Sequence, residues 1–220
     1  MKEQFQNKTS IIFEIIETGI SKHIFRKLDN SHDLALNREI SQILTILSLG
    51  ERREMKKLVN SGLIQLLVQE IQKSPDSEIV TNCVMSLGNI SSTHIEFRNK
   101  IIAFEPKIFS KLKSFVSQRG IQKEIAYFVA SMIRRDRISI HEFESSYSEG
   151  IEILSVCLNQ FDFSNEHTKE TEQYLYEIIN SFCVLNVMVL SGAVKDPLIH
   201  DMSKLAAIKV DEAVNRFNLF

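Results

Sequence analysis

The sequence has no tryptophan and few of the residues that mark several other classes of protein. It has three Pro and seven Gly in 220 residues, which is too few for an all-β sandwich with its many turns. Its three cysteines form no C-x-x-C pair, so neither a cysteine metal site nor a redox motif is indicated. Lys and Arg number 26 and Asp and Glu number 28. The chain therefore has no excess of positive charge, and non-specific binding to nucleic acid is not favoured.

The sequence also lacks the hydrophobic runs that target or anchor proteins. The first ten residues, MKEQFQNKTS, do not contain the apolar core of a signal peptide. The longest uncharged run, residues 178–194, is interrupted by polar side chains and is shorter than the roughly 20 apolar residues of a spanning helix. Cys83, Cys157 and Cys183 lie in largely apolar sequence, so we expect buried, reduced thiols. These features predict an intracellular protein of the cytoplasm, the nucleus or both.

Motifs specific to a reaction are missing as well. None of the six histidines belongs to an H-E-x-x-H motif, and no G-x-S-x-G, Walker or G-x-G-x-x-G sequence is present. Carboxylates are abundant, but none can be assigned to acid–base work without geometry. We therefore expect no enzymatic activity, no cofactor and no metal site.

The chain contains an internal repeat of about 43 residues. Residues 15–20 resemble residues 58–63, because in both segments two apolar and two polar residues precede a glycine and an aliphatic residue. The series continues at spacings of 43, 43, 45 and 42 residues through Gly19, Gly62, Glu105, Gly150 and Gly192. A glycine after an apolar helical turn is typical of a left-handed residue that ends a helix. We expect Gly62 and Gly150 to end helices, and a helix can start at Pro106.

A long amphipathic helix precedes each unit of this repeat. Apolar residues recur at three- and four-residue steps, which predicts long helices near residues 33–49, 77–91, 120–135 and 169–183. Asp76 or Ser77 can cap the second of them. No segment alternates strictly between apolar and polar residues, so no strand is predicted. Four residues are expected to be fully buried between repeats: Leu67, Val84, Leu87 and Val129.

A short helix, a glycine, a second helix and a long third helix within about 40–47 residues resemble the armadillo and HEAT repeats. The segment Met85–Ile90, MSLGNI, is similar to the W-A-L-x-N-I pattern of importin-α third helices, which favours armadillo. The resemblance runs from about Thr9 to about Ala213. It implies an all-α chain, an armadillo-type α-solenoid of four to five three-helix repeats. We expect one array over residues 1–220, with repeat boundaries near 31, 76, 119 and 164 and a partial repeat after 204.

In importin-α, the third helices line a concave groove in which Asn holds the backbone of an extended peptide and Trp rings hold lysine stems. The resemblance implies that the groove residues here are Met85, Asn89, Phe128, Tyr176 and Asn180. For Phe128 and Tyr176, residue type leaves groove and core equally open. Ile46 and Met132 stand where importin-α third helices have the groove Asn, and Thr93 stands where that family has an acidic residue. We therefore expect a groove that accepts a less basic, more apolar segment.

The repeat and the missing catalytic motifs predict a non-enzymatic scaffold that binds a protein or an extended peptide segment along its concave third-helix surface, as a subunit of a larger complex. The alternative is a divergent importin-α-like nuclear-import adaptor that recognises a basic signal. Arg134, Arg135 and Arg137 close the third long helix, where cations offset the helix dipole. A basic edge for an acidic partner or RNA is the other interpretation of these arginines. No membrane span is expected, and nucleic acid is not the expected partner.

Overall fold

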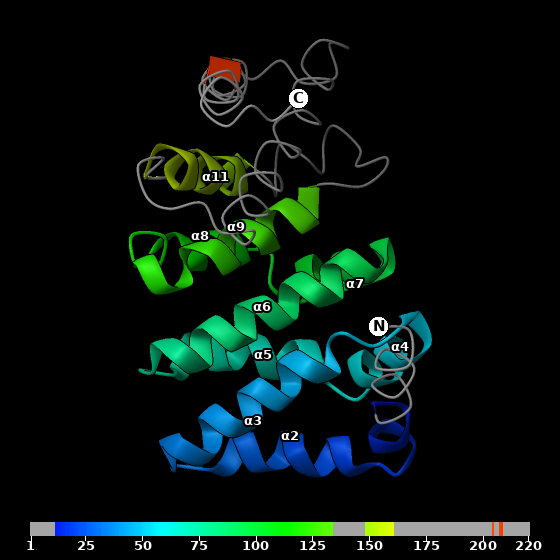
Figure 1. Ribbon diagram of the computed structural model, residues 1–220. Helices are drawn as coiled ribbons and strands as arrows, with labels where there is room; N and C mark the ends of the chain where they lie inside the picture. The colour runs from blue at the N-terminus through cyan, green and yellow to red at the C-terminus, as the bar shows by residue number, and fades with distance from the viewer. Residues whose placement is uncertain (1–11, 134–147, 161–203, 205–206, 209–220) are drawn as a thin grey trace, which may run out of the picture. The chain divides into compact units, whose positions relative to one another are not determined.

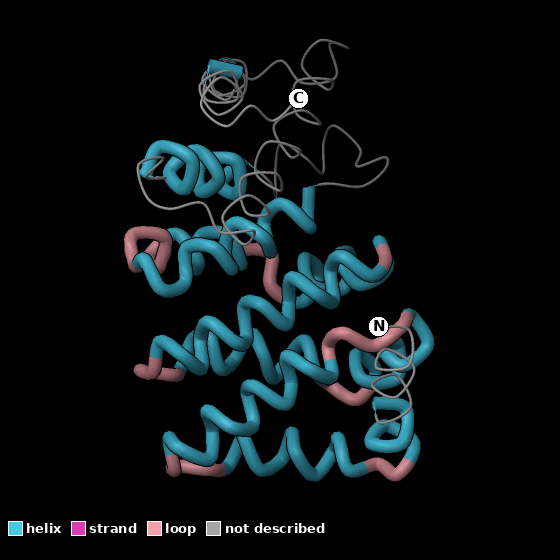
Figure 2. Tube along the Cα trace, viewed as in Figure 1, coloured by secondary structure: helices cyan, strands magenta, loops and turns pink. Residues whose placement is uncertain are grey.

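The computed structural model describes residues 12–133, 148–160, 204, 207 and 208, and all regular secondary structure within them is α-helical (Figures 1 and 2). This confirms the predicted all-α class. Residues 12–17 are helical, and the other helices are α2 (Ile20–Asn30), α3 (Leu34–Leu47), α4 (Arg52–Asn60), α5 (Leu63–Lys73), α6 (Ser77–Thr93), α7 (Ile95–Phe104), α8 (Ile108–Lys113), α9 (Arg119–Ile133) and α11 (Ser148–Gln160). The chain forms two compact units, Met1–Pro106 and Lys107–Phe220.

In the first unit, a short helix, a second helix and a long third helix follow one another twice. Residues 12–17, α2 and α3 form the first set, and α4, α5 and α6 form the second. The two third helices, α3 and α6, pack against each other, α5 packs against α6, and α2 packs against α3 and α5 (Figure 1). The order of the helices is thus the one that the 43-residue repeat predicts.

An aspartate caps the N-terminus of each third helix of the first unit. The Asp33 side chain accepts hydrogen bonds from the backbone N–H groups of Ala35 and Leu36. Asp76 caps α6 in the same way, so Asp76 rather than Ser77 is the cap. Helices α3, α6 and α9 confirm three of the four predicted long helices, and the fourth, near residues 169–183, lies outside the described residues.

The core of each unit consists of the apolar stripes that the sequence shows. The four residues predicted to be buried, Leu67, Val84, Leu87 and Val129, all have 0% exposure. Cys83 and Cys157 are buried and form no disulfide within the described part of the chain, and Cys183 lies outside it. Burial raises the pKa of the Cys83 thiol, so this cysteine is an inert core residue.

One of the helix boundaries predicted at the repeat marks needs correction. Gly62 follows α4 and directly precedes α5, and its φ of 98° is the left-handed conformation expected of a glycine at a helix end. Gly19 has a φ of 73° directly before α2. Gly150, however, lies within α11. A Cβ there would be 3.2 Å from Cγ1 of Val129, so this glycine permits close packing and does not end a helix. Pro106 precedes α8, which begins two residues later at Ile108.

We expect Gly62→Val to lower the free energy of unfolding by about 1 kcal/mol or more, because a β-branched residue is strained at positive φ. Chemical denaturation measures this loss. Gly120→Val is the matched control, since Gly120 is exposed near the start of α9 and its added Cβ would meet nothing within 4 Å. That variant should be neutral or slightly stabilised. An equal loss in both variants would contradict the conformational role of Gly62.

Candidate functional site

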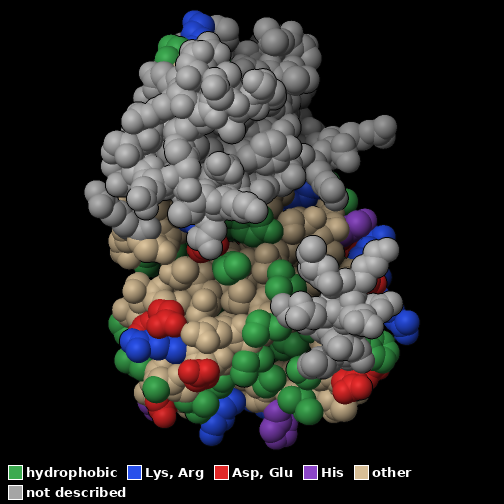
Figure 3. Space-filling view, in the orientation of Figure 1, with side chains coloured by type: hydrophobic (Ala, Val, Ile, Leu, Met, Phe, Trp, Pro, Cys, Tyr) green, Lys and Arg blue, Asp and Glu red, His purple; other side chains and the backbone are tan. Residues whose placement is uncertain are grey.

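The third helices of the first unit, with the turn that follows α3, present a strip of exposed and part-exposed side chains, which the buried Gly88 and Asn89 interrupt on α6. We call this strip the third-helix surface, and it is formed by Gln42, Ile46, Leu49, Thr81, Met85 and Ser92. Ile46 and Leu49 are 54% and 61% exposed, and Met85 is half-buried. Gln42 Nε2 donates a hydrogen bond to Oε1 of Glu78 at 3.0 Å, which joins the exposed sides of α3 and α6. Figure 3 shows hydrophobic side chains gathered on this face among polar surface.

Hydrogen bonds between small polar side chains hold α3 and α6 together beneath this surface. We call them the polar seam: Ser41, Thr45 and Ser48 of α3 and Asn82, Ser86 and Asn89 of α6. Asn82 Nδ2 donates to Ser41 Oγ at 2.9 Å, and the hydroxyls of Thr45 and Ser86 are 3.2 Å apart. Buried polar groups are costly unless they are paired. The seam therefore fixes the register of the two helices.

Asn89, the residue that resembles an importin-α ladder Asn, belongs to this seam. Its Nδ2 donates to Ser48 Oγ at 2.9 Å, and the residue is only 7% exposed. With so little of its side chain exposed, Asn89 offers little of its amide to a peptide backbone. The exposed and part-exposed side chains of these two helices include the apolar Ile46 and Met85. The surface is thus more apolar than the ladder that the resemblance implies.

One end of the third-helix surface is charged, and its charges pair with one another. Arg38 donates to Oδ2 of Asp76 through Nε at 2.8 Å and Nη2 at 2.6 Å, and its Nε is 3.6 Å from Oε2 of Glu78. The hydrogen bond from Arg38 holds the pKa of the Asp76 carboxyl below its usual range, with help from the backbone N–H groups of Ile79 and Glu78. A cationic ligand would have to compete with Arg38 for these carboxylates.

One predicted groove residue lies in the core of the second unit. Phe128 is fully buried, with its ring centroid 6.1 Å from that of Phe109, so it is a core residue. Tyr127, its neighbour on α9, is part-exposed and lies 42 residues after Met85. The prediction of Phe128 as a groove residue is therefore wrong, because its ring packs in the core beside Phe109. The remaining predicted site residues, Tyr176, Asn180, Arg134, Arg135 and Arg137, lie outside the described residues.

Other kinds of site find no support in the described part of the chain. No group of three or more His, Cys, Asp and Glu side chains there could hold a metal ion. None of the described helices has both the length and the apolar character needed to cross a membrane.

Comparison with known proteins identifies the architecture. Residues 56–92 match the family model described as the Armadillo/beta-catenin-like repeat. A designed armadillo repeat protein in complex with the peptide (KR)4 has a TM-score of 0.66 over 91% of this chain and 86% of its own, at 16% identity. The fold is an armadillo-type α-solenoid.

Further solved structures agree with the armadillo fold. A computationally designed armadillo repeat protein for modular peptide recognition has a TM-score of 0.64 at 14% identity and covers 91% of this chain and 86% of its own. An engineered protein has a TM-score of 0.62 at 22% identity, with coverages of 93% and 84%. Comparison with curated proteins finds no significant match. These similarities establish the armadillo fold and do not support importin-α specificity in particular.

Proposed function

We propose that this chain is a non-enzymatic armadillo scaffold that holds an extended partner segment on its third-helix surface, within a larger intracellular assembly. The observation that carries the proposal is the exposure of Ile46 and Leu49 beside the half-buried Met85. Aliphatic side chains on a structured helical surface lose contact with water when a partner covers them. Gln42, Thr81 and Ser92 lie among them and supply hydrogen-bonding groups.

The chemistry of the surface favours a segment in which aliphatic and small polar residues alternate. An extended segment points successive side chains to opposite sides, so one set can lie on Ile46 and Met85 while the backbone faces the polar side chains. The structural relatives are consistent with this use of the fold, since one is in complex with a peptide and another was designed for peptide recognition. The nuclear-import alternative needs acceptors for lysine, and here Asp76 and Glu78 already face Arg38.

The test uses a fluorescent eight-residue peptide in which Leu alternates with Ser, titrated against the whole chain. Ile46→Ser should weaken its binding about five- to tenfold, because about half of an isoleucine's apolar area no longer leaves water. Phe104→Ser is the matched control, since Phe104 is 41% exposed on α7 and lies outside the third-helix surface. Binding that weakens equally in both variants, or in neither, would contradict the proposed site.

A further inference from the structure

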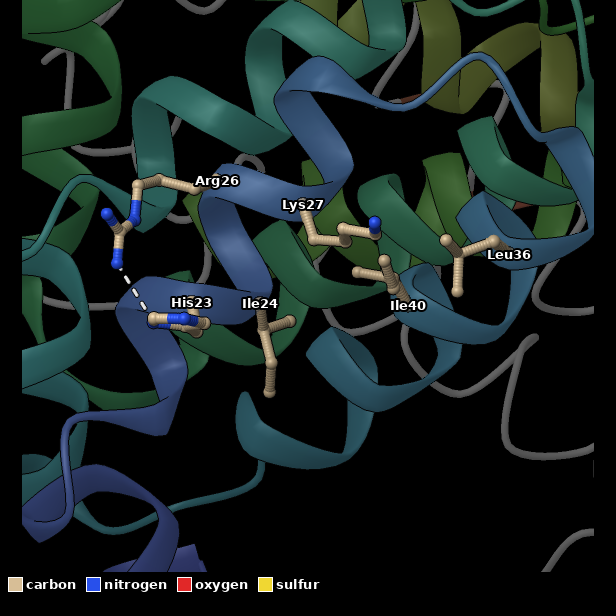
Figure 4. A pocket seen from close by; sticks show the side chains of 6 residues that line it. All are labelled: His23, Ile24, Arg26, Lys27, Leu36 and Ile40. Carbon is tan, nitrogen blue, oxygen red and sulfur yellow. Dashed lines mark hydrogen bonds between the residues drawn. The ribbon is translucent and has the colours of Figure 1, made fainter.

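A second apolar surface lies between α2 and α3, at the bottom of the view in Figure 1. Its centre is a cavity of about 470 Å³ lined by His23, Ile24, Arg26, Lys27, Leu36 and Ile40, which we call the α2–α3 groove (Figure 4). On the inner side of these two helices lie α5 and α6. Leu36 and Ile40 share a stripe of α3, and the seam residues Ser41 and Thr45 lie on another side of the helix. The groove is therefore distinct from the third-helix surface.

The floor of the groove extends along both helices at helical spacing. Ile20, 50% exposed, precedes Ile24 by one turn of α2, and Ile43, 38% exposed, follows Ile40 by one turn of α3. Two apolar stripes on neighbouring helices form ridges with a trough between them. A third helix with its own aliphatic stripe at i, i+3 or i+4, and i+7 fits such a trough.

The α2 side of the groove carries three cations. In the described residues, no carboxylate lies within ion-pair distance of Lys22, Arg26 or Lys27. The single acidic residue of α2, Asp29, pairs with Lys73 at 3.4 Å. Arg26 Nη2 donates to Nδ1 of His23 at 2.9 Å, so its guanidinium lies at the His23 end of the groove (Figure 4).

Three cations elsewhere in the first unit, by contrast, pair with acidic side chains. Arg38, Lys57 and Lys73 all face carboxylates. Glu39 is exposed on α3, across the apolar stripe from α2. The groove thus has a positive side along α2 and a negative residue on the α3 side. Charge complementarity of this kind selects the partner and sets its orientation.

We propose that the α2–α3 groove docks an amphipathic helix of a partner protein, with an aliphatic stripe on the groove floor and Asp or Glu residues on the flank that faces α2. The occupant and the surface both differ from those of the extended segment, so this docking is independent of the proposed function. Arg26 and Lys27 provide the charge contacts, and Ile24, Leu36 and Ile40 provide the apolar ones.

The test uses two fluorescent 15-residue helical peptides with the same leucine stripe, one with a Glu flank and one with a Lys flank. The Glu peptide should bind the whole chain with a dissociation constant below about 100 µM, and the Lys peptide should bind at least tenfold more weakly. The double variant Arg26→Glu/Lys27→Glu should reverse this preference. Arg53→Glu/Lys56→Glu is the matched control, because it makes the same charge change at exposed positions of α4. It should leave both affinities within about twofold.

Equal losses of Glu-peptide binding in the two double variants would show general electrostatic attraction and would overturn the proposal. A second measurement uses Ile24→Asp, with circular dichroism to establish that the variant is folded. Loss of peptide binding in the folded variant supports the groove, and unchanged binding overturns it. Two other occupants are tested directly. If the chain forms concentration-dependent dimers that Ile24→Asp abolishes, the occupant is a second copy of the chain and the proposal is overturned. If anionic vesicles bind as tightly as the Glu peptide, the occupant is a lipid surface and the proposal is likewise overturned.

Discussion

Replacing Leu87 by Ala should lower the free energy of unfolding by about 2–5 kcal/mol, the range for truncation of a fully buried leucine. Leu87 has 0% exposure in α6, which packs against α3, α5 and α7 in the first unit. The three neighbouring helices restrict collapse into the space that the side chain leaves, so the cost includes both lost apolar burial and a residual cavity. Urea denaturation followed by circular dichroism measures the change.

Ser92→Ala is the control for Leu87→Ala in the same helix. Ser92 is exposed, and its hydroxyl donates to the backbone oxygen of Asn89. Its substitution should change stability by no more than about 0.5 kcal/mol. A cost of only a few tenths of a kcal/mol for Leu87→Ala would mean that Leu87 does not face the core of the first unit.

The second large effect is expected at the cap of α6. Asp76→Ala removes the acceptor for the backbone N–H groups of Glu78 and Ile79, which costs about 1–2 kcal/mol. It also removes the Oδ2 atom to which Arg38 donates through both Nε and Nη2. Asp33→Ala is the matched control, because Asp33 caps α3 through the same two kinds of bond and has no such arginine. Asp76→Ala should therefore cost more than Asp33→Ala, and equal losses would contradict a stabilising role for the Arg38 pair.

The same carboxyl predicts a pH dependence of known sign. The folded pKa of Asp76 lies below its unfolded value, which is about 3.9. Its charge therefore stabilises the fold fully above that pH, and the contribution is lost as the pH falls through the folded pKa. Asp76→Asn keeps a good capping residue and removes the charge. The stability difference between wild type and Asp76→Asn should shrink as the pH falls from 7 to below 4, and a difference that grows would contradict the pairing.

The sequence was sufficient to predict the helices because their signals are local. The apolar spacing of α6, the cap at Asp76 and the glycine at 62 all act within one or two turns, and the structure has them at the expected places. Gly150 was misinterpreted because a glycine beside an apolar run has two different uses. It can adopt positive φ, or it can admit a neighbouring side chain, and only the position of Val129 distinguishes them.

The functional surface was harder to predict because it depends on pairs of helices. Tyr127 and Phe128 are adjacent aromatic residues, and only the packing of α9 against its neighbours decides which of them is buried. The polar seam did leave a signal, since Ser41, Thr45 and Ser48 share the i, i+4, i+7 spacing of Asn82, Ser86 and Asn89. The sequence does not say that these two stripes bond to each other or that Asn89 bonds to Ser48. Both follow only from the packing of α3 on α6.

The most direct test of the central claim compares two peptides on the same wild-type chain. A classical lysine-rich import signal needs π faces and carboxylates to receive its ammonium groups. Each cation–π contact contributes about 0.5–2 kcal/mol to binding, and each charge-assisted hydrogen bond contributes about 1.5–3 kcal/mol. Met85 supplies no π face, and Thr93 has no charge. Fluorescence titration should give a dissociation constant no tighter than about 100 µM for this signal and tighter binding for the Leu–Ser peptide. Micromolar binding of the lysine-rich signal that Asn89→Ala abolishes would contradict the scaffold and support an import adaptor.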